Sequence, residues 1–261
     1  MMISIQWLLN KSINIKWIAS FTLSLALLVN PAVLSVYEPG AQKPVPTGRR
    51  SGAGTTRGCS GKGIPLTVLA SRRYVGQTIS GHPTFAWFVP GDSASKLVKF
   101  AIYEWVPSGE AKEVRKLSLQ SLPGIMKLSP FSKNEPGLQP GKEYLWQVII
   151  QCDPDNPSSD LVSETSVEVV TMPAVVQTKL NKAVNSVEKA HIYAEEGLWY
   201  DALGEALKLA HTSKLGKVGS TLLNDLAKSE VPKSTLELSQ KEREAIEKQL
   251  NNLRQIANKA S

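Results

Sequence analysis

Apolar and polar residues alternate with a period of two over most of residues 64–172, and the period changes to 3.6 after Pro173. A period of two is typical of half-buried strands, and a period of 3.6 is typical of amphipathic helices. The segments with strand character are Ile64–Ala70, Thr84–Val89, Leu97–Trp105, Val114–Leu119, Gly124–Leu128, Glu143–Cys152 and Leu161–Val170. Short strands at this spacing, with no helix between them, predict an antiparallel β-sandwich of the immunoglobulin or fibronectin III-like type.

The clearest strand, Glu143–Cys152, follows a Pro140-Gly141 turn, in which proline presets φ and glycine accepts a positive φ. Its apolar face, which should be buried, consists of Tyr144, Trp146, Val148 and Ile150. Leu138, Pro140 and Tyr144 predict a tyrosine corner, in which the tyrosine hydroxyl bonds to the backbone upstream. An ordinary β-hairpin with a core tyrosine is the alternative.

Residues 173–232 predict a helical region that starts at Pro173. Its first apolar stripe is Val176, Leu180, Val184, Val187 and Ile192. Residues 190–203 predict one tetratricopeptide-like hairpin, with Tyr193 on the first helix, Gly197 in the turn and Trp199 and Tyr200 on the second. A solenoid needs about three such units to bury a core. The hairpin must therefore pack on the sandwich, on a predicted helix at Thr221–Lys228, or on a partner, and we expect Tyr193, Trp199 and Tyr200 to dock that partner.

Residues 233–261 predict a charged C-terminal helix. The pattern Ser234-Thr-Leu-Glu237 is typical of a capping box and would mark its start. Its narrow apolar stripe consists of Leu238, Ile246, Leu250, Leu253 and Ile256. Such a helix would lie on the surface or make a short coiled-coil contact.

Residues 1–35 predict an export signal, because Lys11 and Lys16 precede an apolar run over residues 17–29 that Asn30-Pro31 breaks. An uncleaved membrane anchor is the alternative, and this segment would then be the chain's contact with a membrane. Residues 36–63 are basic and rich in Pro, Gly, Ser and Thr, with few apolar residues to bury. They predict a flexible arm.

The net charge of +7 is unevenly distributed along the chain. Residues 1–63 carry +6, residues 64–172 carry −1 and residues 173–261 carry +2. The positive charge thus comes mainly from the export segment and the arm, whereas the regions predicted to fold are close to neutral. We therefore expect no nucleic acid among the partners.

The chain has two cysteines, Cys59 and Cys152. In an exported chain two cysteines usually pair, because the periplasm and the cell envelope are oxidising. The expected disulfide would pin the end of the arm to the end of the strand Glu143–Cys152. Two unpaired thiols are the alternative.

The histidines and the aspartates after Cys152 lack the spacing of known metal or catalytic sites. His82, His191 and His211 have no neighbouring cysteine or carboxylate at metal-ligand spacing. Asp153, Asp155 and Asp160 lack the glycine and the final glutamate of a calcium loop, and Asp-Pro and Asn-Pro dipeptides favour turns. We therefore expect no metal, no cofactor and no catalytic set.

Four segments together resemble a family of exported cyanobacterial proteins known as domain of unknown function nine hundred and twenty-eight. They are GRRSGAGTTRGC (48–59), HPTFAWFVP (82–90), PGLQPGKEYLWQVIIQCD (136–153) and AEEGLWYDAL (194–203). The resemblance covers about residues 46–230, and residues 231–261 extend beyond it. Both cysteines fall on the family's cysteine positions, which supports the disulfide. The family carries no established activity or catalytic residues, so the resemblance implies none here.

These patterns favour an exported, non-enzymatic protein-interaction or structural module of the periplasm or cell envelope, with a protein partner there. An alternative is an envelope protein that binds a ligand or a carbohydrate through exposed aromatic residues such as Trp105 or Trp199. A weaker alternative is a hydrolase whose site is assembled from His82, Asp153 and Asp155.

Overall fold

A computed structural model describes residues 37–40, 43–45, 59, 63–91, 95–105, 110–232 and 239–260. The predicted export segment, residues 1–35, lies outside the described residues, as does most of the predicted arm. The described residues all belong to one compact unit. None of the helices within the described ranges is both long enough and apolar enough to cross a membrane.

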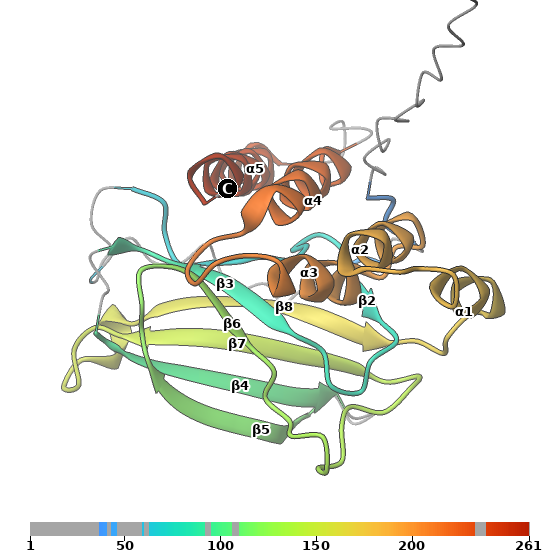
Figure 1. The fold of residues 1–261 in the computed structure, drawn as a ribbon. Helices are drawn as coiled ribbons and strands as arrows, with labels where there is room; N and C mark the ends of the chain where they lie inside the picture. The colour runs from blue at the N-terminus through green and yellow to red at the C-terminus, as the bar shows by residue number, and fades with distance from the viewer. Residues whose placement is uncertain are drawn as a thin grey trace, which may run out of the picture. The chain divides into compact units, whose positions relative to one another are not determined.

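The strands form two sheets, as the period of two predicts (Figure 1). One sheet has the order β1-β3-β6 and the other has the order β2-β8-β7-β4-β5. The strands are β1 (Thr67–Val68), β2 (Gly76–Thr78), β3 (Phe85–Val89), β4 (Leu97–Trp105), β5 (Ala111–Gln120), β6 (Gly124–Leu128), β7 (Glu143–Gln151) and β8 (Leu161–Val169). The prediction of purely antiparallel sheets is wrong at one edge, where β2 pairs with β8 in parallel.

The core between the sheets is aromatic. On β7 every second side chain is buried, and these are Tyr144, Trp146, Val148 and Ile150, as the alternation predicts. Phe85 of β3 reaches across from the other sheet, and its ring centroid lies 4.9 Å from that of Trp146. Aromatic pairs at such separations stabilise the fold beyond their buried area. The two sheets are therefore joined by direct ring contacts.

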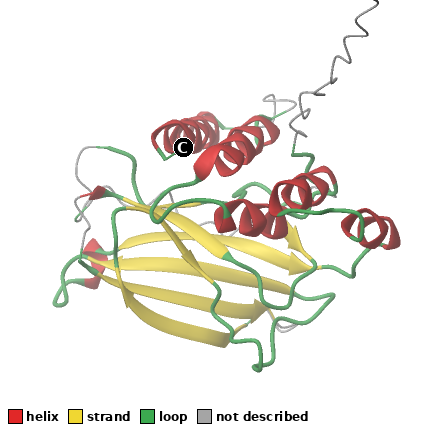
Figure 2. Cartoon of the chain, in the orientation of Figure 1, coloured by secondary structure: helices red, strands yellow, loops and turns green. Residues whose placement is uncertain are grey.

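The α-helices gather on one side of the sheets (Figures 1 and 2). They are α1 (Ala174–Leu180), α2 (Ser186–Glu195), α3 (Trp199–Lys208), α4 (Gly216–Ser229) and α5 (Gln240–Lys259). A short 3₁₀ helix, η2 (Pro157–Ser159), lies apart from them in the loop between β7 and β8. The predicted first stripe is wrong at Val184, which lies in the break between α1 and α2 and is 82 % exposed. The Asn185 side chain accepts from the Glu188 N–H and starts α2 anew.

The C-terminal helix begins later than the sequence predicts. α5 starts at Gln240, with Ser239 and Glu242 forming a complete capping box. The box predicted at Ser234–Glu237 lies outside the described residues. The predicted stripe is buried at Leu250, Leu253 and Ile256, which pack this helix against α4.

Two described stretches of the predicted arm, residues 37–40 and 43–45, contact the folded unit. Tyr37 and Val45 are buried, at 2 % and 3 % exposure. The Glu38 N–H donates to the Ala194 carbonyl of α2, and the Val45 N–H donates to the carbonyl of Arg73. Buried apolar side chains and backbone bonds thus hold these two stretches against the folded unit despite their glycine- and proline-rich composition.

Candidate functional site

The α2–α3 hairpin is fastened to the sheets by its two predicted docking aromatics. Trp199 is fully buried, and its indole N–H donates to the Leu69 carbonyl at 2.8 Å. The Tyr200 hydroxyl accepts from Trp146 Nε1 at 2.8 Å and donates to the Ser166 carbonyl at 3.2 Å. The prediction that Trp199 and Tyr200 dock a partner is therefore wrong, because both side chains pack inside the chain's own core.

Of the two aromatic residues expected to bind a ligand, Trp199 is buried and therefore inaccessible to one. Trp199 cannot form an exposed platform, and Trp105, at the end of β4, is half-buried. Tyr193, the third residue predicted to dock a partner, differs from both neighbours on the hairpin. Its side chain is half-buried and faces a surface cleft.

The residues of the predicted tyrosine corner meet at the start of β7. The backbone N–H of Gln139 donates to the Tyr144 hydroxyl at 2.9 Å, which is a backbone contact of the kind found in such corners. Leu138 is buried, and its N–H donates to the Gly81 carbonyl at 2.8 Å. Pro140 lies exposed in the turn before the strand.

A disulfide joins Cys59 to Cys152 at the other end of β7. Their Cα atoms lie 5.3 Å apart, within the usual range for a disulfide. The bridge spans 93 residues and fits an oxidising, exported compartment. Both ends of β7 are thus held, one by a turn and the other by a covalent bond.

A cleft of about 500 Å³ lies where α3 and α2 meet the loop between β2 and β3. Its lining combines hydroxyl, imidazole, carboxylate and ammonium groups with one half-buried tyrosine. The polar members are Ser80, His82, Thr84, Ser129, Tyr193, Asp201, Glu205 and Lys208. Three segments distant in sequence therefore supply one polar surface.

Asp201 anchors α3 to the loop at the floor of this cleft. The backbone N–H of Ile79 donates to Asp201 Oδ2 at 3.0 Å. Burial nevertheless raises the pKa of the Asp201 carboxyl to about 6, since desolvation disfavours the charged form. Burial, with the nearby charges of Asp201 and Glu205, raises the pKa of Tyr193 to about 12. A half-buried carboxyl with a raised pKa in a cleft marks a candidate binding site.

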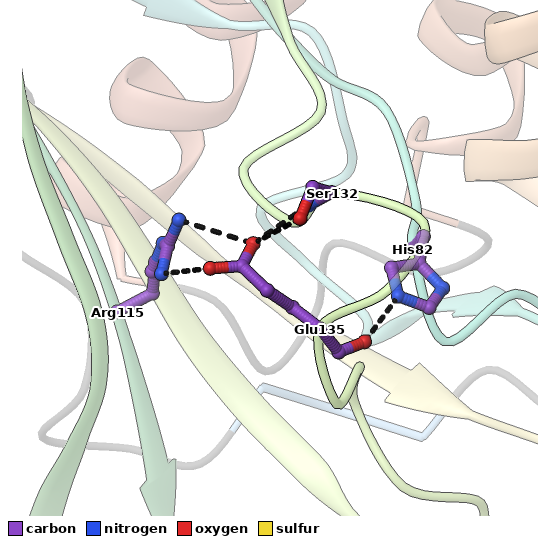
Figure 3. Close-up of polar contacts among 4 residues, drawn as sticks. All are labelled: His82, Arg115, Ser132 and Glu135. Atoms are coloured by element: carbon purple, nitrogen blue, oxygen red, sulfur yellow. Dashed lines mark hydrogen bonds and ion pairs between the residues drawn. The ribbon is translucent and has the colours of Figure 1, made fainter.

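A polar network braces one wall of the cleft (Figure 3). His82 Nε2 lies 3.0 Å from the Glu135 carbonyl oxygen, which accepts the hydrogen bond. The Glu135 carboxylate accepts from the Ser132 N–H at 2.7 Å and hydroxyl at 2.9 Å, and pairs with Arg115 of β5 at 3.1 Å. The bonds from Ser132, followed by the Arg115 charge, hold the Glu135 pKa below its usual value. The network fixes the side chain of His82 beside the cleft.

The hydrolase site predicted from His82, Asp153 and Asp155 is not assembled. His82 lies near the start of β7, whereas both aspartates follow its end. Nine strand residues span about 30 Å. The Asp153 carboxylate accepts from the Asp155 N–H, and the Asp160 carboxylate accepts from the Cys152 N–H. Asp153 and Asp160 therefore stabilise the turn that follows β7. Within the described ranges, no group of three histidine, cysteine or acidic residues is placed to hold a metal ion.

The family model for Domain of Unknown Function (DUF928) matches residues 51–241. The chain belongs to this family. The DUF928 match includes both cysteines and every residue of the cleft; compared with the range of about 46–230 that the resemblance covers, it starts five residues later and ends 11 residues later.

Other comparisons add little to the family assignment. No match is found among curated proteins. Among solved structures, the fn3 domain of human collagen alpha-1(XX) chain is similar at 19 % identity and a TM-score of 0.25. The match covers 46 % of this chain and 96 % of that domain.

Sequence patterns alone do not single out the acidic residues of the cleft. Asp201 and Glu205 lie four residues apart on α3 and therefore on the same helix face. Asp201 follows Trp199 and Tyr200 directly, so it lies beside the side that packs on the sheets. The one hint in the sequence is a carboxylate beside the apolar face of a helix. Only the fold shows that the β2–β3 loop covers this carboxylate and forms a cleft with it.

Proposed function

We propose that the protein is exported and acts as a non-enzymatic interaction module of the cell envelope, in which the cleft receives a segment of a protein partner. The observation that carries this proposal is the cleft itself, with polar side chains placed on a rigid frame. Trp199 and Tyr200 lock α3 to the sheets, and the network of His82 and Glu135 fixes the facing loop. Binding groups held in this way lose little conformational entropy when a partner binds.

The α2–α3 hairpin keeps a docking role in this proposal, but through a different surface. Its aromatic residues Trp199 and Tyr200 face inward, and the cleft side presents Tyr193, Asp201 and Glu205 instead. Export is supported by the disulfide, which is stable in oxidising compartments. A rigid exported frame with a polar cleft suits binding of an extended segment.

The test is site-specific photocrosslinking in the native host. A photoreactive amino acid replaces Ser129, which is exposed at the cleft, or Lys241, which is exposed on α5. Captured proteins are then identified by mass spectrometry. We expect one envelope protein to be captured stoichiometrically from position 129 and not from position 241. Capture of nothing above background from position 129, or of the same set from both positions, would contradict the proposal.

A further inference from the structure

The charges of the cleft are predominantly negative. Asp201 and Glu205 line it from α3, and the cation among its lining residues is Lys208. Lys208 already pairs with Glu205, at 2.5 Å from Nζ to Oε1; the Lys208 side chain is 64 % exposed, whereas the Glu205 side chain is only 13 % exposed. The exposed ammonium of Lys208 loses little when it returns to water. The largely covered Glu205 carboxylate needs a positive partner, so a cation that enters the cleft can take the place of Lys208.

Tyr193 gives the cleft an aromatic wall close to these carboxylates. Tyr193, Asp201 and Glu205 all line the same cleft. The Tyr193 hydroxyl, Thr84 and Ser129 add further polar groups around the cleft. An aromatic ring beside carboxylates suits a cation with an apolar stem, because the ring attracts the charge and packs against the stem.

We propose that the cleft binds an arginine side chain, which is carried by the docked segment of the partner. This inference rests on the proposed function. The guanidinium of this arginine would replace the Lys208 ammonium as the partner of Glu205. The planar guanidinium can donate two parallel N–H bonds to the Glu205 carboxylate. Tyr193 would cover the arginine stem, and Asp201 would add a second negative charge at the floor. Charge complementarity and the aromatic wall thus select the same occupant.

The first test uses a small probe on the purified full chain. Binding of Nα-acetyl-arginine amide is measured by ligand-observed NMR titration and compared with Nα-acetyl-citrulline amide, which has nearly the same shape and no charge. We expect the citrulline probe to bind at least about tenfold more weakly, which corresponds to about 1.4 kcal/mol. Equal binding of the two probes would overturn the proposal.

Matched variants locate the effect at the cleft. Glu205→Gln keeps the shape of the side chain and removes its charge, and we expect at least about fivefold weaker binding of the arginine probe. Glu195→Gln makes the same change on α2, at a residue that pairs with Lys179 and lies outside the cleft lining. We expect it to bind as the wild type does. Unchanged binding by Glu205→Gln, or equal losses in both variants, would overturn the assignment.

The crosslinking experiment separates this inference from the proposed function. Loss of the partner from position 129 in Glu205→Gln, with retention in Glu195→Gln, supports both. Retention in both variants leaves docking intact and overturns the arginine site. If position 129 captures no partner while the arginine probe discriminates as expected, docking fails and the chemistry of the site stands.

Discussion

At the scale of single residues, the two aromatics of α3 carry more structural weight than their positions in the sequence indicate. Both are buried with their polar atoms satisfied, which is the arrangement that makes buried tyrosine and tryptophan favourable. The sequence identified Trp199 and Tyr200 as important but assigned them to a partner. Residue type shows that such a side chain seeks an apolar surface, and only the fold shows that the chain's own sheets provide it.

The Tyr200 hydroxyl should stabilise the fold measurably. In Tyr200→Phe the buried indole N–H of Trp146 loses its acceptor, which costs about 1 to 3 kcal/mol. We expect urea denaturation to show this loss in the free energy of unfolding. The control is Tyr103→Phe, because the Tyr103 hydroxyl accepts from Gln147 on a half-buried face. This variant should lower the free energy of unfolding by less than Tyr200→Phe does. Equal costs for both variants would contradict the role assigned to Tyr200.

Asp201 should make stability depend on pH. Its pKa in the folded state is about 6, against an ordinary value of 3.8. Between about pH 4 and pH 6 the unfolded chain has lost this proton and the folded chain has kept it, so rising pH destabilises the fold through this group. Above the folded pKa the penalty is complete and stays constant.

The variant Asp201→Asn tests this dependence, because asparagine does not ionise and its amide oxygen can still accept from the Ile79 N–H. We expect the free energy of unfolding of the variant, relative to wild type, to rise by about 1 to 3 kcal/mol from pH 4 to pH 7. Urea denaturation at both pH values measures this difference. A constant difference, or one that falls with pH, would show that the Asp201 pKa is not raised.

At the scale of elements, the alternation of apolar residues predicted the long strands well and the short ones poorly. β2, with three residues, is too short to show an alternation, and its parallel pairing with β8 depends on tertiary contacts. The start of α5 was ambiguous for another reason. Ser234–Glu237 and Ser239–Glu242 have the same capping-box spacing, and local sequence does not choose between them.

Gly197 connects α2 to α3 in a conformation that a larger residue would strain. Its φ is +74°, and an added Cβ would collide with the backbone nitrogen of Gly40. We expect Gly197→Ala to lower the free energy of unfolding by more than about 1 kcal/mol in urea denaturation. Gly141→Ala is the matched control, because Gly141 has a φ of +79° but open space around it. A cost for Gly197→Ala no greater than that for Gly141→Ala would mean that the arm does not press on this turn.

The disulfide should stabilise the molecule by closing a long loop. Its cysteines are 93 positions apart, for which the chain-entropy model gives about 4 to 5 kcal/mol, and measured values are often smaller. We expect the double variant Cys59→Ser, Cys152→Ser to lose about 2 to 5 kcal/mol in chemical denaturation. Thiol titration of the unfolded, unreduced wild-type protein should find no free thiols. Two free thiols would exclude the bridge.

At the scale of the whole molecule, the cleft could not be predicted, because it exists only where three distant segments meet. The sequence singles out the α2–α3 hairpin and the segment around His82, but nothing in it places them or Ser129 side by side. Their meeting depends on how α3 docks on the sheets, which local periodicity does not encode. The fold class was within reach of sequence patterns, whereas the site required the packing of helices on sheets.

The most direct test of this account asks whether the α2–α3 hairpin opens independently of the sheets. Native-state hydrogen exchange under increasing urea would compare amides of α3 with amides of β7. Because Trp199 and Tyr200 lock the helix to the sheets, we predict that both groups exchange through the same global unfolding, with equal free energies. A contrary result would be exchange of the α3 amides through a local opening of lower free energy while the β7 amides stay protected. Trp199 and Tyr200 would then be free to contact a partner.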